Sequence, residues 1–211
     1  MCGKHCFVRQ TSYQSLMNML SNTLPALALS LSPDPFYQAI TVDCRLPEQR
    51  LRVLESYFEY SLAEAQRTGH CVLADNPTLG ATAWLLPRTV EVEAYESEAK
   101  QSFLQALLGP KGYQNYQGIL GFMSPIAERH VEKNAWYLSI VGVHPSAQSK
   151  GLGKQLLLPT LRLAAEQQAP CYLETFTTRN LAFYARLGFL PIAEKLEPTT
   201  GASYTIMHRS A

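Results

Sequence analysis

The apolar segment AWYLSIVGV, residues 135–143, ends where a glycine-bearing turn leads into a helical pattern. A continuous apolar run of this kind is typical of a strand that is covered on both faces. The helical pattern that follows places a set of apolar residues on one side: Leu152, Leu156, Leu157, Leu161 and Ala164. A buried strand that passes directly into an amphipathic helix requires a central sheet with helices packed on it.

The rest of the chain alternates between helical and strand patterns. Helices are predicted over 13–31 with a break near Pro25, 46–69, 91–108, 113–131 and 181–187. Strands are predicted over 5–9, 70–74, 79–86, 171–176, 189–197 and 202–209. Residues 32–36 are predicted as a loop and 75–78 as a hairpin turn. Asn180 is placed to cap the helix over 181–187, and Pro159 is expected to kink the helix that follows residue 151. This alternation predicts an α/β or α+β fold with one central sheet.

Composition limits the classes of function. The chain has 211 residues, 46% hydrophobic and 17% charged, which fits a single domain over 1–211. The formal net charge is +1 and no block of like charge occurs, so no nucleic-acid partner is expected. The apolar stretch 16–32 contains Asn18, Asn22 and Pro25, which indicates a soluble helix and no membrane or signal segment. A cytoplasmic protein is the expectation.

The cysteines indicate free thiols in a reducing compartment. Five are present, an odd number, and no CxxC pair occurs. Cys2 and Cys6 flank His5 closely enough to suggest part of a metal site, but no second ligand pair completes it. No metal is therefore expected.

The segment QSKGLGK, residues 148–154, has the features of a phosphate cradle. A helix N-terminus exposes unpaired N–H groups, and glycines let a phosphate approach them. Lys150 and Lys154 add positive charge. Neither the dinucleotide fingerprint nor the P-loop pattern is met, because Leu156 stands where the third glycine of the fingerprint would be. The alternative is a glycine-bearing loop that merely begins a helix.

A second segment, NLAFYARLGF at 180–189, favours the phosphate cradle over a loop that merely begins a helix. The first segment follows a strand ending in VGV and has the pattern Gln148-x-x-Gly151-x-Gly153. The second has an Asn and a Tyr on a helix ending in Gly-Phe. Together, in this order, the two segments resemble the GNAT superfamily of N-acetyltransferases. The resemblance is strong over 134–190 and faint before residue 70. It implies a GNAT fold: a mixed, mostly antiparallel sheet with helices on both faces, splayed between a fourth strand at 135–143 and a fifth at 171–176. It also implies that 134–211 bind acetyl-CoA and that 1–133 form the acceptor side.

The resemblance further implies roles for particular residues. The backbone of Val141, Gly142 and Val143 would contact the pantetheine arm. The pyrophosphate would lie against the cradle residues Gln148, Ser149, Lys150, Gly151, Leu152, Gly153 and Lys154. Asn180 would contact the cofactor, cap its helix, or both. Tyr184 would be the general acid that protonates the leaving thiolate, with core packing as the alternative.

The general base is less defined by the pattern. Glu174 lies in a strand fit for burial, where a carboxylate needs a partner or a function and its pKa is raised. It is predicted to be the base, with two alternatives: anchoring the substrate ammonium, or pairing with Arg179 or Arg186. His144 is expected to make a loop contact.

The acceptor is predicted to be a primary amine of a small molecule, attacked directly on the acetyl thioester. Tyr37 and Trp84, with Phe36 and Trp136, are candidates for an aromatic acceptor pocket, and ordinary core packing is the alternative for each. Two other functions stay open: acetylation of a protein N-terminus or lysine, and an acyl-CoA-binding module without turnover. Monomer and homodimer are both compatible with the sequence.

Overall fold

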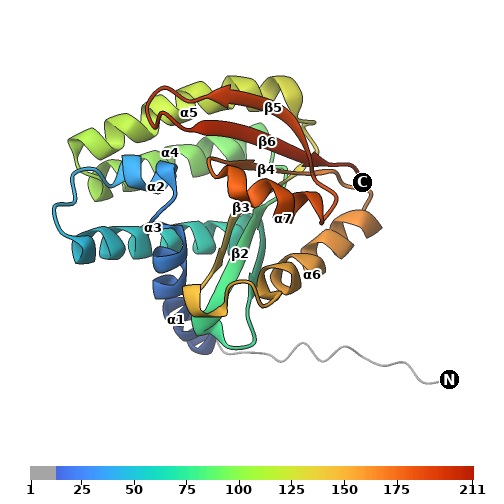
Figure 1. The fold of residues 1–211 in the computed structure, drawn as a ribbon, viewed down its shortest axis with the longest axis horizontal. Coiled ribbons are helices and arrows are strands. Elements are labelled where there is room, and N and C mark those ends of the chain that lie inside the picture. The colour runs from blue at the N-terminus through green and yellow to red at the C-terminus, as the bar shows by residue number, and fades with distance from the viewer. Residues whose placement is uncertain (1–12) are drawn as a thin grey trace.

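The computed structural model describes residues 13–211, with side chains from residue 19 onward (Figure 1). The strand predicted over 5–9 and the Cys2, His5 and Cys6 group lie outside the described residues. The helices are α1 Tyr13–Leu31, α2 Pro35–Ile40, α3 Pro47–Thr68, α4 Val90–Leu107, α5 Pro110–His130, α6 Leu152–Glu166 and α7 Leu181–Ala185. The strands are β1 Gly69–Leu73, β2 Gly80–Leu85, β3 Trp136–Val143, β4 Cys171–Thr175, β5 Leu190–Leu196 and β6 Ser203–Arg209.

The six strands form one open sheet in the order β1-β2-β3-β4-β6-β5. Every neighbouring pair is antiparallel except β3 and β4, which run parallel. The mixed, mostly antiparallel sheet predicted from the resemblance is confirmed. The hairpin between β1 and β2 is also confirmed, with a short 3-10 turn at Pro77–Leu79 as its connection.

Helices cover both faces of this sheet (Figure 1). One face packs against α1, α3, α4 and α5 and buries the larger apolar cluster, which includes Leu27, Phe58 and Ile119. The other face packs against α6 and α7 and buries a second cluster around Trp84 and Leu157. Among the described residues, no helix is both long and apolar enough to cross a membrane.

Two expectations about local structure are wrong. The break near Pro25 does not occur, because α1 continues through that residue. The helix buries Leu24, Leu27 and Ala28 in the larger cluster, and this packing outweighs the one backbone hydrogen bond that the proline removes. The predicted loop over 32–36 ends early, because Pro35 begins α2 and Asp34 caps it by accepting from the N–H of Phe36 at 2.9 Å.

The predicted splay of the sheet is present. β3 and β4 are the strands expected as fourth and fifth, and they pair only from Trp136↔Cys171 to Leu138↔Leu173. β3 then continues to Val143 without a partner on its β4 side, while β4 stays paired with β6 up to Thr175. A wedge-shaped gap therefore opens at the carboxyl ends of the two parallel strands.

Candidate active site

A β-bulge in β3 decides which backbone groups face the gap. In the ladder with β2, Ala83 pairs with Ile140 and Trp84 pairs with Leu138, so Ser139 is an extra residue. Beyond the strand end, the N–H of His144 donates to the carbonyl of Leu79 at 2.8 Å, on the β2 side. Because the backbone groups of successive residues face alternate sides of a strand, those of Val141 and Val143 are directed into the gap.

These two valines differ in how their backbone groups are used. The N–H of Val143 donates to Ser30 Oγ at 3.3 Å, and its carbonyl accepts from Gln148 Nε2 at 3.0 Å. Val141 has no strand opposite it on that side and lines the cavity described below. The structure therefore leaves the backbone of Val141 open to a ligand, whereas that of Val143 is engaged within the protein.

Gly142 has a structural task. A Cβ on this residue would lie 2.6 Å from Leu27 Cδ2, so the glycine lets α1 pack closely on the strand. Its backbone faces β2, in the register Ala81↔Gly142. The backbone of Gly142 was predicted to contact the pantetheine arm, but it faces β2 and not the gap.

The start of α6 fits a phosphate group. Gly151 is the residue before the helix, with φ of 84°, and a Cβ there would meet nothing within 4 Å. In the described chain no side chain caps this helix, so the N–H groups of its first turn remain available to an anion. Gly153 allows a close approach to α7, because a Cβ there would lie 3.3 Å from Phe183 Cζ.

The other cradle residues support the same turn. The side chain of Lys150 folds back and donates to the carbonyl of Ser146 at 2.8 Å. Ser149 has a φ of 60°, a left-handed conformation that turns the chain sharply before the helix. Leu152 packs beside Val143 and Leu156 in a small apolar cluster. His144 accepts from the N–H of Ser146 at 3.2 Å and so makes the loop contact expected of it.

A cavity of about 1250 Å³ opens from the gap and extends between the two halves of the chain. Val141, Glu174, Asn180 and Tyr184 line it from the part of the chain after residue 133, and Tyr37 lines it from α2. The structure thus brings together both predicted catalytic residues and one predicted acceptor residue. Asn180 makes no capping hydrogen bond to α7, so that expectation is wrong, and its side chain belongs to the cavity wall instead.

Glu174 is held by two tyrosines. Tyr204 Oη donates to Glu174 Oε1, and Tyr137 also hydrogen-bonds this carboxylate. Burial raises the pKa of Glu174, and the two hydrogen bonds oppose that rise. In the part of the chain that the structure describes, Glu174 forms no ion pair with Arg179 or Arg186, which excludes that alternative.

Tyr184 is 7% exposed and lies on α7, at the edge of the gap. Burial raises its pKa above the ordinary value for tyrosine, and the Asp34 carboxylate adds to the effect. The phenol therefore stays protonated at neutral pH, as a general acid must.

Asp34 is a site residue that sequence reasoning missed. It lines the cavity, accepts from Thr177 Oγ1 at 2.8 Å, and so links α2 to the segment before α7. Burial raises its pKa against the effect of these hydrogen bonds and of Arg179. The Asp-Pro pair that begins α2 is a recognisable capping signal, but nothing in the sequence places it opposite Tyr184.

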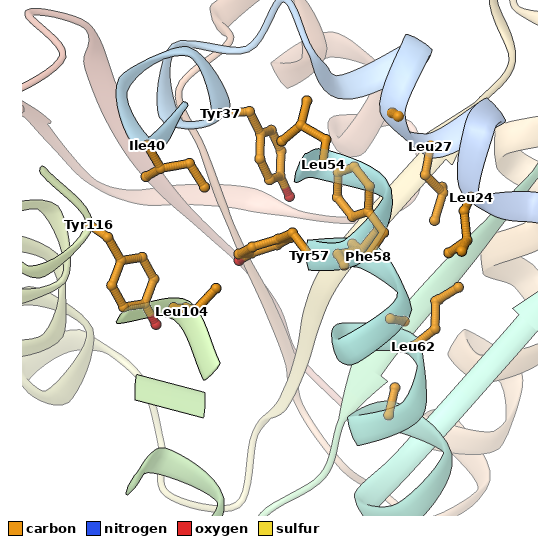
Figure 2. Packing of buried hydrophobic residues seen from close by; sticks show 14 of the residues in the cluster. Leu24, Leu27, Tyr37, Ile40, Leu54, Tyr57, Phe58, Leu62, Leu104 and Tyr116 are labelled. Atoms are coloured by element: carbon orange, nitrogen blue, oxygen red, sulfur yellow. The ribbon is translucent and has the colours of Figure 1, made fainter. Parts of the chain in front are cut away.

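An aromatic wall formed by residues of the first half of the chain lines the same cavity as Glu174 and Tyr184. Tyr37, Tyr57 and Tyr116 come from α2, α3 and α5, and Figure 2 shows their rings gathered around one space. Phe36 extends the wall and stacks on Phe176 with ring centroids 6.2 Å apart. The predictions for Tyr37 and Phe36 are consistent with this placement.

Trp84 does not belong to the wall. Its side chain is 0% exposed and packs in the second cluster beneath α6, away from the cavity. Successive residues of β2 face opposite sides of the sheet: Ala81 and Ala83 pack in the larger cluster, whereas Trp84 packs in the second cluster. Trp136 packs in the same cluster. The predicted acceptor role of Trp84 is therefore corrected to core packing.

A buried ion-pair network forms the far wall of the cavity. Glu64, whose side chain is 3% exposed, binds Arg88 at 3.0 Å and Lys100 at 2.9 Å. Arg88 also binds the exposed Glu93 at 2.8 Å. Burial raises the pKa of Glu64, but the two cations lower it by more, so that the pKa lies below its ordinary value. Sequence reasoning did not identify this network, because its members come from α3, α4 and the segment after β2.

Comparison with known proteins agrees with this geometry. The family model described as "Acetyltransferase (GNAT) family" matches residues 46–189. A polyamine N-acetyltransferase of Drosophila melanogaster has a similar structure, with a TM-score of 0.64 and 14% identity over 92% of this chain and 96% of that one. An agmatine N-acetyltransferase has a TM-score of 0.60 and 15% identity over 96% of this chain and 98% of that one.

A Corynebacterium glutamicum protein described as "histone acetyltransferase HPA2 and related acetyltransferase" has a TM-score of 0.62 and 18% identity, over 92% of each chain. At these identities the structural matches show the fold. The family match covers most of the chain, so this protein belongs to the GNAT family of acetyltransferases. It is an acetyl-CoA-dependent N-acetyltransferase.

Proposed function

We propose that this protein transfers the acetyl group of acetyl-CoA to a primary amine of a small molecule, by direct attack of the amine on the thioester. The observation that carries the proposal is the placement of Glu174 and Tyr184 on the wall of one cavity that opens from the splayed strands. The first is a partly buried carboxylate whose pKa is raised, and the second is a phenol that stays protonated.

Acetyl-CoA, when bound, supplies the activated thioester. Its pyrophosphate is held by the first-turn N–H groups of α6 between Gly151 and Lys154, and its arm follows β3 along Val141. The N–H of Val141 donates to the thioester oxygen as negative charge develops there, which is worth about 3 kcal/mol in comparable sites.

The protons are moved by side chains of the cavity wall. Glu174 accepts the proton of the acceptor ammonium, so that a neutral amine forms the new C–N bond. Tyr184 Oη donates its proton to the sulfur as the C–S bond breaks. The amide nitrogen loses its remaining extra proton in the same collapse, and this proton restores the Tyr184 phenol. The two groups line the same cavity, and Tyr184 begins protonated, as a general acid must.

The cavity wall favours a compact acceptor over an extended peptide. The wall is aromatic at Tyr37, Tyr57 and Tyr116, and the buried Glu64 network closes its far side. Amine cations bind well between aromatic faces and carboxylates. The similar structures include enzymes named for polyamine and agmatine, and both compounds belong in the acceptor panel.

A narrower resemblance also guides the choice of acceptors. Residues 134–190 are similar in sequence to puromycin N-acetyltransferase, although the structural matches do not support that narrower likeness. Puromycin and other aminoacyl compounds therefore enter the panel beside the diamines, and the first 133 residues would decide among them.

The proposal is tested by mixing the purified protein with acetyl-CoA and this amine panel and measuring release of the CoA thiol. We expect turnover with at least one small primary amine, and acetylation of that amine by mass spectrometry. Thiol release at the background rate with every small amine would contradict the proposal. Turnover of peptides alone would move the activity to protein acetylation.

A further inference from the structure

The far wall of the reaction cavity offers hydrogen-bond donors to a ligand, although it contains a carboxylate. Glu64 accepts from Arg88 Nη1 through Oε1 at 3.0 Å, and from Lys100 Nζ through Oε2 at 2.9 Å. Each oxygen of this carboxylate is thus already engaged by a cation. A second ammonium group brought to the wall would be repelled by two positive charges and would find no oxygen of Glu64 without a cation on it.

The two cations keep donors that the protein does not use. Arg88 donates from Nε to Glu93 and from Nη1 to Glu64, while its Nη2 atom has no partner among the residues that the structure describes. Lys100 has three N–H groups and, in the same part of the chain, only the Glu64 carboxylate as an acceptor. The two side chains are 10% and 17% exposed and line the cavity. Their remaining donors are therefore available to a ligand there.

The other carboxylates near this wall do not reverse its charge. Glu93, Glu128 and Glu132 line the cavity but are exposed, so water and salt screen them. Glu96 is buried, but it is paired with Arg67 at 2.8 Å. In the buried part of the wall, two cations therefore share a single carboxylate.

The cationic wall lies at a distance from Glu174. Tyr172 and Glu174 are two residues apart on the same face of β4, which is about 7 Å along the strand. Burial is the largest cause of the raised pKa of Tyr172, Glu174 adds to it, and Arg88 lowers it. Arg88 has no such influence on the pKa of Glu174. Arg88 is thus on the far side of Tyr172 from Glu174.

This arrangement defines the shape of a matching acceptor. A carboxylate fits Arg88 and Lys100, because charge-assisted hydrogen bonds from two cations suit its two oxygens. The space between the two ends is lined by aromatic rings, including Tyr57 and Tyr116 (Figure 2), which suits an apolar spacer. An α-amino acid is too short, because its amine and carboxylate are attached to the same carbon. An ω-amino acid or a dipeptide is long enough.

We propose, as an extension that rests on the function proposed above, that the preferred acceptor carries a carboxylate at the end remote from its primary amine. Arg88 and Lys100 bind this carboxylate while the amine faces Glu174. The acceptor class is then ω-amino acids and dipeptides. Diamines, which bring a second cation to the same wall, are poor acceptors.

Three acceptors with the same primary amine and a carbon chain of the same length test this preference: ε-aminohexanoate, hexylamine and hexamethylenediamine. They differ only at the end remote from the reacting amine. We expect kcat/KM for ε-aminohexanoate to exceed the other two values at least tenfold, as charge-assisted hydrogen bonds to a carboxylate predict. Equal values for the three acceptors, or a preference for the diamine, would overturn the proposal.

The variant Lys100→Gln removes one of the two cations. It should bring the ratio of kcat/KM for ε-aminohexanoate to that for hexylamine down about tenfold, whereas Lys100→Arg should keep most of the ratio. A general loosening of the wall would lower both kcat/KM values and leave their ratio unchanged. The matched control is Lys133→Gln, which removes an exposed lysine from the rim of the same cavity and should keep the wild-type ratio. An unchanged ratio in Lys100→Gln would contradict the role of the wall.

Binding of hexanoate separates this inference from the proposed reaction, because hexanoate has no amine to acetylate. Calorimetry without acetyl-CoA should show binding to the wild type and to Lys133→Gln, and about tenfold weaker binding to Lys100→Gln. If no small amine is acetylated, the proposed function is wrong, and hexanoate binding still decides whether the wall takes a carboxylate. If amines are acetylated but hexanoate does not bind, only the present inference is wrong.

Discussion

Residues 134–211, the proposed acetyl-CoA half, and residues 1–133, the proposed acceptor half, contribute different kinds of groups to one cavity. In the first, the decisive groups are backbone atoms: the N–H groups at the start of α6, the open edge at Val141, and a left-handed Gly151. In the second they are side chains: three tyrosines and a buried carboxylate with its cations. A backbone site depends on the spacing of a few residues, whereas a side-chain wall depends on how distant helices pack.

The largest effect is expected among residues 1–133, in the ion-pair network of Glu64. Glu64→Gln should destabilise the protein by about 3 kcal/mol, because it leaves Arg88 and Lys100 beside a neutral group in a buried site. Urea denaturation at pH 7 measures this. The control is Glu93→Gln, which removes an exposed partner of the same Arg88 and should cost less than about 1 kcal/mol. Equal losses in the two variants would mean that burial of the network is unimportant.

The next largest effect tests the chemistry at the border between the halves. Tyr184→Phe should lower kcat at least tenfold, and typically by about a hundredfold for loss of a general acid, with little change in the Kd of acetyl-CoA. Steady-state kinetics and calorimetry separate the two quantities. Tyr37→Phe removes a phenol from the opposite wall and should act mainly on KM for the amine. Unchanged turnover in Tyr184→Phe would remove this residue from the acid role.

A pH profile tests how Glu174 is held. As a base it works when ionised, so kcat/KM should fall as the pH drops through its raised pKa. Tyr204 donates a hydrogen bond that favours the ionised form, so Tyr204→Phe should raise this pKa further and move the acidic limb up by about one pH unit.

The control for that profile is Tyr172→Phe. Tyr172 stacks on Tyr137 with ring centroids 4.7 Å apart but donates no hydrogen bond to Glu174. The acidic limb of the kcat/KM profile of Tyr172→Phe should lie at the same pH as that of the wild type. If both variants move the limb equally, the effect comes from general loosening of the wall and the Tyr204 bond has no particular importance.

The smallest effect belongs to the backbone site. Gly151→Ala forces a left-handed φ of 84° on a residue with a Cβ, which costs about 1 kcal/mol. We expect lower thermal stability and weaker acetyl-CoA binding together. Gly121→Ala lies inside α5 with nothing near its Cβ position and should stabilise by about 0.5 kcal/mol. Normal acetyl-CoA binding by Gly151→Ala would show that the turn geometry is dispensable.

This contrast explains which features the sequence could reveal. The strand at 135–143, the turn at 148–154 and the helix with Tyr184 follow one another within about 50 residues. Their order and spacing carry the resemblance to the GNAT superfamily, and that resemblance implied the splayed sheet and the site at the start of α6. Asp34, Tyr57, Tyr116 and the Glu64 network are separated widely along the chain, and only their packing brings them to one cavity. Trp84 shows the converse error: as an aromatic residue it was a candidate for the acceptor pocket, with core packing as the alternative, and its place on β2 directs it into the core.

The extra residue at Ser139 sets how this site tolerates change. Every group after it keeps its direction only while the number of residues between Leu138 and the start of α6 stays constant. Exchanging one side chain for another leaves the backbone donors in place, except at Gly142, which has no room for a Cβ, and at Gly151, which has a left-handed φ. Removing a single residue between Leu138 and Val141 would instead turn the backbone groups of Val141 toward β2. This part of the site is therefore sensitive to the number of residues in the stretch as well as to its two glycines.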